Sequence, residues 1–250
     1  MKQETYNKYF SIFILAGMTI AVVLTTIFKL SAAETGKVLL LVSAFGSLMG
    51  VASTVASANG KIITFLFGLL DVSIYGVICF LNWRSTGAGL GNCLLHLVYF
   101  VPMQFVGFYQ WRARSSASGS SKLKARRLDL RRSLLLTAGF LLLSVGCYFL
   151  IAAFDKSEAT GFIKFAIVLD VIPMVCNILG QLLMSTAYME QWILWIGVNV
   201  FSILMWIFSL KSGGGDYAAI YIIKYSFYLI NSFNGLRIWI NLSKPDGSCK

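Results

Sequence analysis

The sequence predicts an all-α polytopic membrane protein with eight transmembrane helices arranged 1+3+1+3. Three observations predict it: the composition, the length of the apolar runs and an internal repeat. The 250 residues are 58% hydrophobic and only 12% charged, and the mean hydropathy is +0.76. Soluble domains average about 25% charged residues. The low value over the whole chain therefore indicates that lipid is the main solvent.

The apolar runs are long enough to cross a bilayer as helices. About 20 apolar residues span the hydrocarbon core as a helix, whereas a barrel strand needs about 10 of alternating polarity. These runs are continuous, which favours helices. The eight runs are residues 10–30, 38–58, 61–82, 91–111, 133–153, 162–186, 190–210 and 217–241.

The first run resembles a cleavable signal, because Lys2 and Lys8 precede it and "LSAAE" follows it. The apolar region of a signal peptide has only about 7–15 residues. The first run is longer, so we expect it to be a retained first helix.

The basic residues are concentrated in one loop. The formal net charge is +11, and eight of the 21 Lys and Arg residues lie in "RARSSASGSSKLKARRLDLRR", residues 112–132. A basic loop rich in Gly and Ser between two spans is typical of the cytoplasmic side. This placement predicts cytoplasmic termini and contact with anionic lipid headgroups. It argues against nucleic-acid binding, because the charge follows membrane topology.

An internal repeat appears when the chain is aligned with itself at an offset of 128 residues. The offset pairs Gly107 with Gly235, Trp111 with Trp239, Asp71 with Asn199, and Ser57 with Ser185. The register holds without a gap across three spans, so helices 2–4 look like a copy of helices 6–8. Because helix 5 crosses once between the copies, the two triple-helix bundles run parallel. Helix 1 is expected to lie outside the repeat.

This repeat gives the domain organisation. The predicted parts are an N-terminal tail and helix 1 at 1–37, a first bundle at 38–111, the basic loop and linking helix 5 at 112–161, a second bundle at 162–241, and a C-terminal tail at 242–250. In transporters with parallel repeats, the substrate lies near the midplane between the bundles.

Polar residues inside the spans mark a candidate binding site, because they are costly in lipid. Trp192, Trp195 and Asn199 in "EQWILWIGVNV" lie at i, i+3 and i+7, on one helix face. The other candidates are Asp71, Gln104, Asn177, Gln181, Asn231 and Asn234. Indoles and amides together would stack on a flat aromatic solute and hydrogen-bond it. A cationic ring would be favoured further, by the aromatic faces and by the carboxyl group.

Several of these residues also have a structural interpretation. An Asn or Gln in a membrane helix often bonds a neighbouring helix. Tryptophans near helix ends are typical of the membrane interface. That interpretation applies to Trp83, Trp111 and Trp239, and it competes for Trp192. Asn199 and the deeper Trp195 are explained less well in this way.

Other residues favour a structural role or argue against an enzyme. Gly107 and Gly235 are expected to allow close helix approach. The five cysteines form no CxxC pair and the chain has one histidine, His96, so no metal cluster is predicted. The sequence contains no HExxH, GxSxG or GxxxxGK[ST] motif. We therefore expect neither a membrane enzyme nor an ATP-driven pump, and no cofactor.

The segments "EQWILWIGVNV", "MQFVGFYQW" and "FNGLRIWIN" closely resemble the PnuC vitamin transporters, from about Val38 to Asn241. The W-x-x-W-x-x-x-N pattern is the most specific element of the resemblance. The resemblance implies a 3+1+3 core similar to SWEET sugar carriers, with an extra N-terminal helix here. It also implies uptake of nicotinamide riboside by facilitated diffusion across the bacterial inner membrane, a cytosolic kinase that traps the substrate, and a homotrimer. Thiamine, riboflavin or a nucleoside remain alternative substrates.

The resemblance also assigns residues to the vitamin site. Trp192, Trp195, Asn199 and Gln104 match the family pattern and are expected to line the site. An amide is expected where this chain has Asp71. A buried carboxyl group is costly to ionise unless a cation pairs with it. Two roles for it stay open: a counter-charge for a cationic ring, or a proton-coupling group.

Overall fold

The computed structural model describes residues 3–32, 37–86, 93–117, 123–154, 165–211 and 217–244. Its elements are α1 (Gln3–Ala32), α2 (Lys37–Ala58), α3 (Thr64–Thr86), the π-helix η1 (Leu95–Phe100), α5 (Val101–Ala117), α6 (Leu130–Phe154), α7 (Phe165–Ser185), α8 (Gln191–Lys211) and α9 (Tyr217–Leu242). η1 runs directly into α5, because Val101 has the helical angles φ −60 and ψ −54. With η1 and α5 as one span, the eight predicted helices are confirmed.

The π-turn has a local cause in the sequence. Pro102 has no N–H to donate, and its ring clashes with the carbonyl group four residues earlier. A wider π-turn accommodates both effects, and such turns occur often at functional sites. The turn carries His96 and Phe100, which both line the cavity described below.

Six of the helices are long and apolar enough to cross a membrane: α1, α2, α3, α6, α7 and α8. The other two spans, η1–α5 and α9, pack among these six. α5 alone has 17 residues, and α9 carries Lys224 and Arg237 among its apolar residues. The chain is therefore a membrane protein with eight spans.

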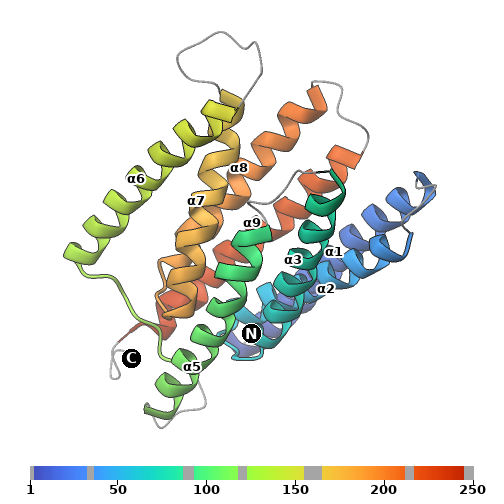
Figure 1. Ribbon diagram of the computed structural model, residues 1–250. Coiled ribbons are helices and arrows are strands. Elements are labelled where there is room, and N and C mark those ends of the chain that lie inside the picture. The colour runs from blue at the N-terminus through green and yellow to red at the C-terminus, as the bar shows by residue number, and fades with distance from the viewer. Residues whose placement is uncertain are drawn as a thin grey trace.

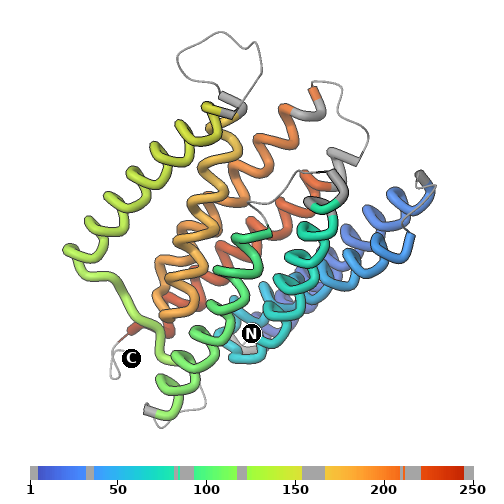
Figure 2. The backbone as a smooth tube through the Cα atoms, in the orientation of Figure 1, coloured from blue at the N-terminus to red at the C-terminus, as the bar shows by residue number. Residues whose placement is uncertain are grey.

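Six spans form a closed ring in the order α2, α3, η1–α5, α7, α8, α9 and back to α2. Each triplet of the predicted repeat contributes one half of this ring (Figures 1 and 2). Outside the ring, α1 packs against α2 and α9, and α6 packs against α7. Figure 1 shows α6 at the left edge of the molecule and α1 with α2 at the right.

The ends of α2 and α7 show that the repeat extends to backbone detail. Gly60 and Ala187 both have left-handed backbone angles, with φ of 64° and 61°. In each case the N–H group donates back into the helix, from Gly60 to Ser57 O at 2.9 Å and from Ala187 to Met184 O at 3.0 Å. A left-handed residue is a common way to end a helix. The left-handed conformation costs an alanine such as Ala187 about 1 kcal/mol, whereas a glycine such as Gly60 adopts it without this penalty.

These turns also correct the register of the repeat. Gly60 and Ala187 lie 127 residues apart, whereas Gly107 and Gly235 lie 128 apart. Phe65 and Trp192, which pack on the latter two glycines, also lie 127 apart. The two halves therefore differ by one residue between Phe65 and Gly107, and the gapless sequence alignment is one position off before that point.

α1 and α6 occupy comparable places in the two halves. Each packs against the first helix of the triplet that follows it. The 1+3+1+3 layout can therefore also be described as two four-helix halves, and an even number of spans per half keeps the two halves parallel.

Two tryptophans join the halves at the end of the molecule that carries the basic loop. The Trp111 indole N–H donates to the carbonyl oxygen of Met184 at 2.7 Å. The Trp239 indole N–H donates to that of Ser57 at 3.0 Å. Each bond links one triplet to the other, and the two side chains are 1% and 0% exposed. The predicted interface role of Trp111 and Trp239 is therefore wrong; the side chain of Trp83 lies outside the described residues.

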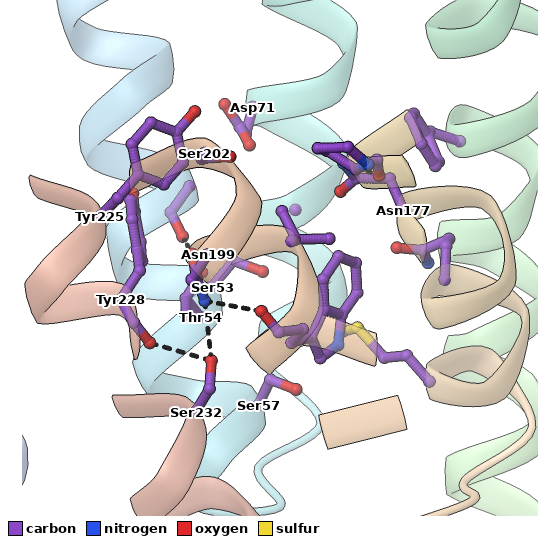
Figure 3. A pocket seen from close by; sticks show the side chains of 18 of the residues that line it. Ser53, Thr54, Ser57, Asp71, Asn177, Asn199, Ser202, Tyr225, Tyr228 and Ser232 are labelled. Carbon is purple, nitrogen blue, oxygen red and sulfur yellow. Dashed lines mark hydrogen bonds between the residues drawn. The ribbon is translucent and has the colours of Figure 1, made fainter. Parts of the chain in front are cut away.

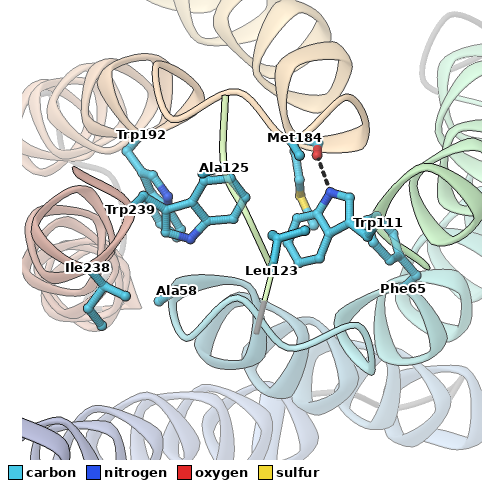
Figure 4. Close-up of a cluster of buried hydrophobic side chains, with 10 residues drawn as sticks. Ala58, Phe65, Trp111, Leu123, Ala125, Met184, Trp192, Ile238 and Trp239 are labelled. Carbon is cyan, nitrogen blue, oxygen red and sulfur yellow. Dashed lines mark hydrogen bonds between the residues drawn. The ribbon is translucent and has the colours of Figure 1, made fainter. Parts of the chain in front are cut away.

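These indoles belong to a cluster of buried apolar side chains that we call the tryptophan cluster (Figure 4). Its members are Ala58, Phe65, Trp111, Leu123, Ala125, Met184, Ala187, Trp192, Ile238 and Trp239. The two predicted close approaches are confirmed beside it. A Cβ atom on Gly107 would lie 2.1 Å from the Phe65 ring, and one on Gly235 would lie 2.7 Å from the Trp192 ring.

The chain between α5 and α6 covers the tryptophan cluster; we call residues 123–129 the strap. Leu123 and Ala125 are 4% and 5% exposed within the cluster. The Ala125 N–H donates to Leu242 O at 3.1 Å, and the Arg126 N–H donates to Ala187 O at 2.7 Å. The strap thereby joins the ends of α7 and α9 and closes this end of the ring.

Candidate functional site

A cavity of about 510 Å³ lies inside the ring. All six ring spans contribute to its wall, so it lies between the two halves. Trp192 and Met184 belong both to this wall and to the tryptophan cluster. The cluster therefore forms the floor of the cavity at the basic-loop end.

Seven of the nine predicted site residues line this cavity. They are Asp71, Gln104, Asn177, Gln181, Trp192, Trp195 and Asn199. They come from α3, α5, α7 and α8, so residues from both halves meet at one place. Their role in binding a ligand stays a prediction.

Asn231 and Asn234 lie away from the cavity wall. The amide group of Asn231 reaches across to α2, where its Nδ2 donates to Thr54 O at 3.4 Å. The Asn234 Oδ1 accepts a hydrogen bond from Arg237 Nη2 at 2.8 Å. Each amide thus makes a contact outside the cavity, and neither residue belongs to its wall. The residues that α9 presents to the cavity are Lys224, Tyr225, Tyr228 and Ser232.

The two indoles and the amide at i, i+3 and i+7 on α8 all lie on the cavity side. Trp195 packs over α7, where a Cβ atom on Gly180 would lie 3.3 Å from its ring. The Nδ2 of Asn199 donates to Trp195 O at 2.8 Å and to Ser232 Oγ at 3.0 Å (Figure 3). Both amide hydrogens are used, so the Oδ1 atom of Asn199 is the group that can accept from a ligand.

Three buried polar atoms in the wall have no hydrogen-bond partner: Ser57 Oγ, Gln104 Oε1 and Trp192 Nε1. A buried polar atom left unpaired costs about 1–3 kcal/mol. The three atoms offer a hydroxyl group, an acceptor and a donor. This combination can satisfy a hydroxyl or carboxamide group on a solute.

Charged groups also face the cavity: Asp71 on α3, Asp170 on α7 and Lys224 on α9. Counted with a neutral His96, these lining residues carry a formal charge of −1. His96 packs among aromatic rings, with centroid distances of 4.5 Å to Tyr75 and 4.9 Å to Phe100. Within the described residues, no group of three His, Cys, Asp or Glu side chains is placed to hold a metal ion.

Sequence reasoning did not select Ser53, Ser57 or Ser232, although all three line the cavity. For Ser232 the repeat carried a signal, because the 128-residue offset pairs it with the selected amide Gln104.

Comparison with known proteins gives consistent matches. Residues 40–241 match the family described as nicotinamide mononucleotide transporter. The nicotinamide riboside transporter PnuC of Neisseria mucosa is 33% identical over 202 residues, which cover 79% of this chain and 71% of the relative. That of Haemophilus influenzae is 30% identical, with 79% and 78% covered. The crystal structure of the vitamin B3 transporter PnuC superposes with a TM-score of 0.64 at 26% identity, covering 94% of this chain and 91% of that chain.

Proposed function

Because the chain belongs to the nicotinamide mononucleotide transporter family, we propose that it takes up nicotinamide riboside by facilitated diffusion with alternating access. The observation that carries the proposal is the cavity between the two halves, lined by two indoles and several amides. Its volume of about 510 Å³ lies within the range of small-molecule sites, about 300–1,000 Å³. An indole face stacks on a pyridine ring, and amides and serines bond a carboxamide and a ribose.

The charges of the cavity favour the riboside over the mononucleotide. Nicotinamide riboside is a monocation, and the lining residues carry a formal charge of −1. A phosphate group would add about −1.5 to −2 charges. Lys224 is the single Lys or Arg among the described lining residues, and two carboxylates share that wall with it.

The same charges rank the other substrates of related chemistry. Thiamine is also a cation with a flat ring, so it is the second candidate. Riboflavin and neutral nucleosides would stack as well, but they would gain nothing from the carboxylates. This ranking makes binding selectivity between cations and neutral rings the property to measure.

The proposed orientation of the protein in the membrane rests on the distribution of its basic residues. The basic loop supports a cytoplasmic position for the closed end and both termini, in the inner membrane. The cavity is then sealed from the cytoplasm by the tryptophan cluster and the strap. Alternating access requires this end to open when the halves rock. A cytosolic kinase would trap the product, a homotrimer is the proposed assembly, and the chain itself would perform no chemistry.

Equilibrium binding to the purified protein tests the proposal. Calorimetric titration with nicotinamide riboside, nicotinamide mononucleotide, thiamine and riboflavin should show the tightest binding for the riboside. Uptake into proteoliposomes should equilibrate the riboside without an ion gradient. Tight thiamine binding with no riboside binding would contradict the substrate, and accumulation that depends on an ion gradient would contradict facilitated diffusion.

A further inference from the structure

The carboxyl group of Asp71 is held at the cavity wall with no ion pair. Its helix packs against α2 so closely that a Cβ atom on Gly50 would lie 2.7 Å from its Oδ2 atom. The residue is half-buried and lines the cavity. Among the described residues, none places a Lys or Arg nitrogen within 4 Å of this carboxylate. The carboxylate therefore lies close to α2 in the cavity wall, without a cation in contact among the described residues.

Lys224 faces the same part of the cavity from the other half of the ring. Its Nζ atom lies 5.9 Å from the ring centroid of Tyr221 and 5.7 Å from that of Tyr228. Lys224 is also the cation that acts electrostatically on Asp71. Its ammonium group thus lies among aromatic faces, within the field of a carboxylate.

This surrounding is also the one that an organic cation prefers. Aromatic faces within about 6 Å and a nearby carboxylate attract quaternary and pyridinium groups through the same forces that hold a lysine. The ammonium group of Lys224 therefore occupies a position in which a cationic ligand would also be stabilised. Asp170 and the aromatic-packed His96 are the other titratable groups of this wall apart from the tyrosines.

We propose that Lys224 is the resident counter-ion of Asp71 in the empty cavity and that a cationic substrate replaces it there. This inference rests on the proposed function, because it concerns the substrate of the same cavity. It assigns Asp71 the counter-charge role and makes Lys224 a specificity-determining residue. The lysine can withdraw, since a long side chain can extend its ammonium group along the helix toward the membrane surface.

The exchange has a consequence for transport as well as for affinity. An uncompensated carboxylate is costly in a low-dielectric interior. The empty carrier must reorient in each cycle of net uptake, and Lys224 keeps Asp71 compensated in that step. During exchange of internal for external substrate, the carrier reorients only when loaded. Lys224 should therefore matter for net uptake more than for exchange.

The test compares a cation with a neutral ligand of nearly the same shape. The probes are nicotinamide riboside and its reduced 1,4-dihydro form, which lacks the positive charge. Lys224→Gln removes the competing cation, so riboside affinity should rise about fivefold to tenfold while the affinity for the reduced form stays within twofold. Asp71→Asn should lower riboside affinity by a similar factor and leave the reduced form unchanged. In proteoliposomes, Lys224→Gln should slow net uptake at least fivefold relative to exchange.

Lys211→Gln is the matched control, because it removes the same charge from an exposed position at the end of α8. It should change none of these values. If Lys224→Gln does not fold, the double variant Asp71→Asn with Lys224→Gln takes its place, and it should have lost the wild-type preference for the charged probe. Equal effects of Lys224→Gln on both probes, or none, would overturn the inference.

Failure of the proposed function would look different. In that case the wild-type protein would not bind nicotinamide riboside at all. The comparison is then made with thiamine, whose ring is also cationic. A rise in thiamine affinity in Lys224→Gln would support the counter-ion role with another substrate, whereas wild-type protein that binds neither cation would refute both proposals.

Discussion

Gly68→Ala is a test of the site that removes no cavity side chain. Gly68 lies on α3 beside Gln104, and an added Cβ atom would lie 2.6 Å from Gln104 Oε1 and 3.1 Å from Ser53 Oγ. The closest ordinary approach of a carbon to an oxygen atom is about 3.3 Å. The amide of Gln104 must therefore shift by roughly 0.7 Å. Because the clash involves the end of a flexible side chain, we expect the protein to fold.

The shift should weaken ligand binding by the value of one hydrogen bond. Gln104 Oε1 is buried and has no protein partner, so we assign its bond to the ligand. One such bond contributes about 0.5–1.5 kcal/mol, which corresponds to a roughly twofold to twelvefold loss of affinity. Titration calorimetry of nicotinamide riboside with the purified variant measures this loss.

Gly146→Ala is the control for the backbone effect of the same substitution. Gly146 lies on α6, and a Cβ atom there would meet nothing within 4 Å. Both substitutions remove a helical glycine, which stabilises a helix by up to about 1 kcal/mol. Only the variant at position 68 should lose affinity. Wild-type affinity in a folded Gly68→Ala protein would refute the assignment of Gln104 to the ligand.

Three further predictions concern the stacking residue, the bonds between the halves, and the strap. Trp195→Ala should lower riboside affinity about tenfold or more through lost stacking, with an unchanged gel-filtration profile; full retention of affinity would show that the indole only packs. Trp111→Phe and Trp239→Phe each remove one bond between the halves, worth about 1 kcal/mol, and should lower the Tm in detergent by about 2–4 °C; equal Tm values would mean that these bonds contribute nothing. Leu123→Asp places a charge in the tryptophan cluster and should loosen the strap. A cysteine introduced at Ser57 should then react faster with a maleimide added from the basic-loop side. An unaltered reaction rate would show that the strap does not seal the cavity.

The fold could be predicted because lipid imposes strict rules on sequence. A helix that crosses lipid must be long, continuous and apolar, so the spans are visible as runs. The repeat then fixed the direction of the second bundle. The gapless alignment missed the one-residue difference between the halves, because the match at Gly107 and Gly235 fixed its offset at 128 while Phe65 and Trp192 lie 127 apart.

The faces of α9 could not be predicted, because this helix carries polar residues on several sides. Tyr228, Asn231, Ser232 and Asn234 follow one another within two turns. Only the packing of α9 against α2, α8 and α1 decides which of them face the cavity. Asn231 and Asn234 therefore lie outside the wall even though their residue type suited it.

The tryptophans near helix ends were misassigned for a related reason. Position near a span end predicts the membrane interface, but Trp111 and Trp239 point inward, where the strap covers them. That covering segment follows the first bundle and packs between both halves. No local pattern around either tryptophan records it. The position of Lys224 in the same cavity wall as Asp71 was missed likewise, because these residues lie on helices from different halves.

The repeat also explains why the site is asymmetric where it meets a ligand. Parallel halves are related about an axis along the membrane normal, so each structure at the closed end occurs twice, as the bonds of Trp111 and Trp239 show. A nucleoside has no such symmetry, and a fully symmetric cavity would accept it in two orientations. The two halves differ at the level of the cavity, where Gln104 in α5 corresponds to Ser232 in α9 and Asp71 in α3 corresponds to Val198 in α8. Duplication therefore supplies the closing contacts, and the differences between the copies give the ligand a single orientation.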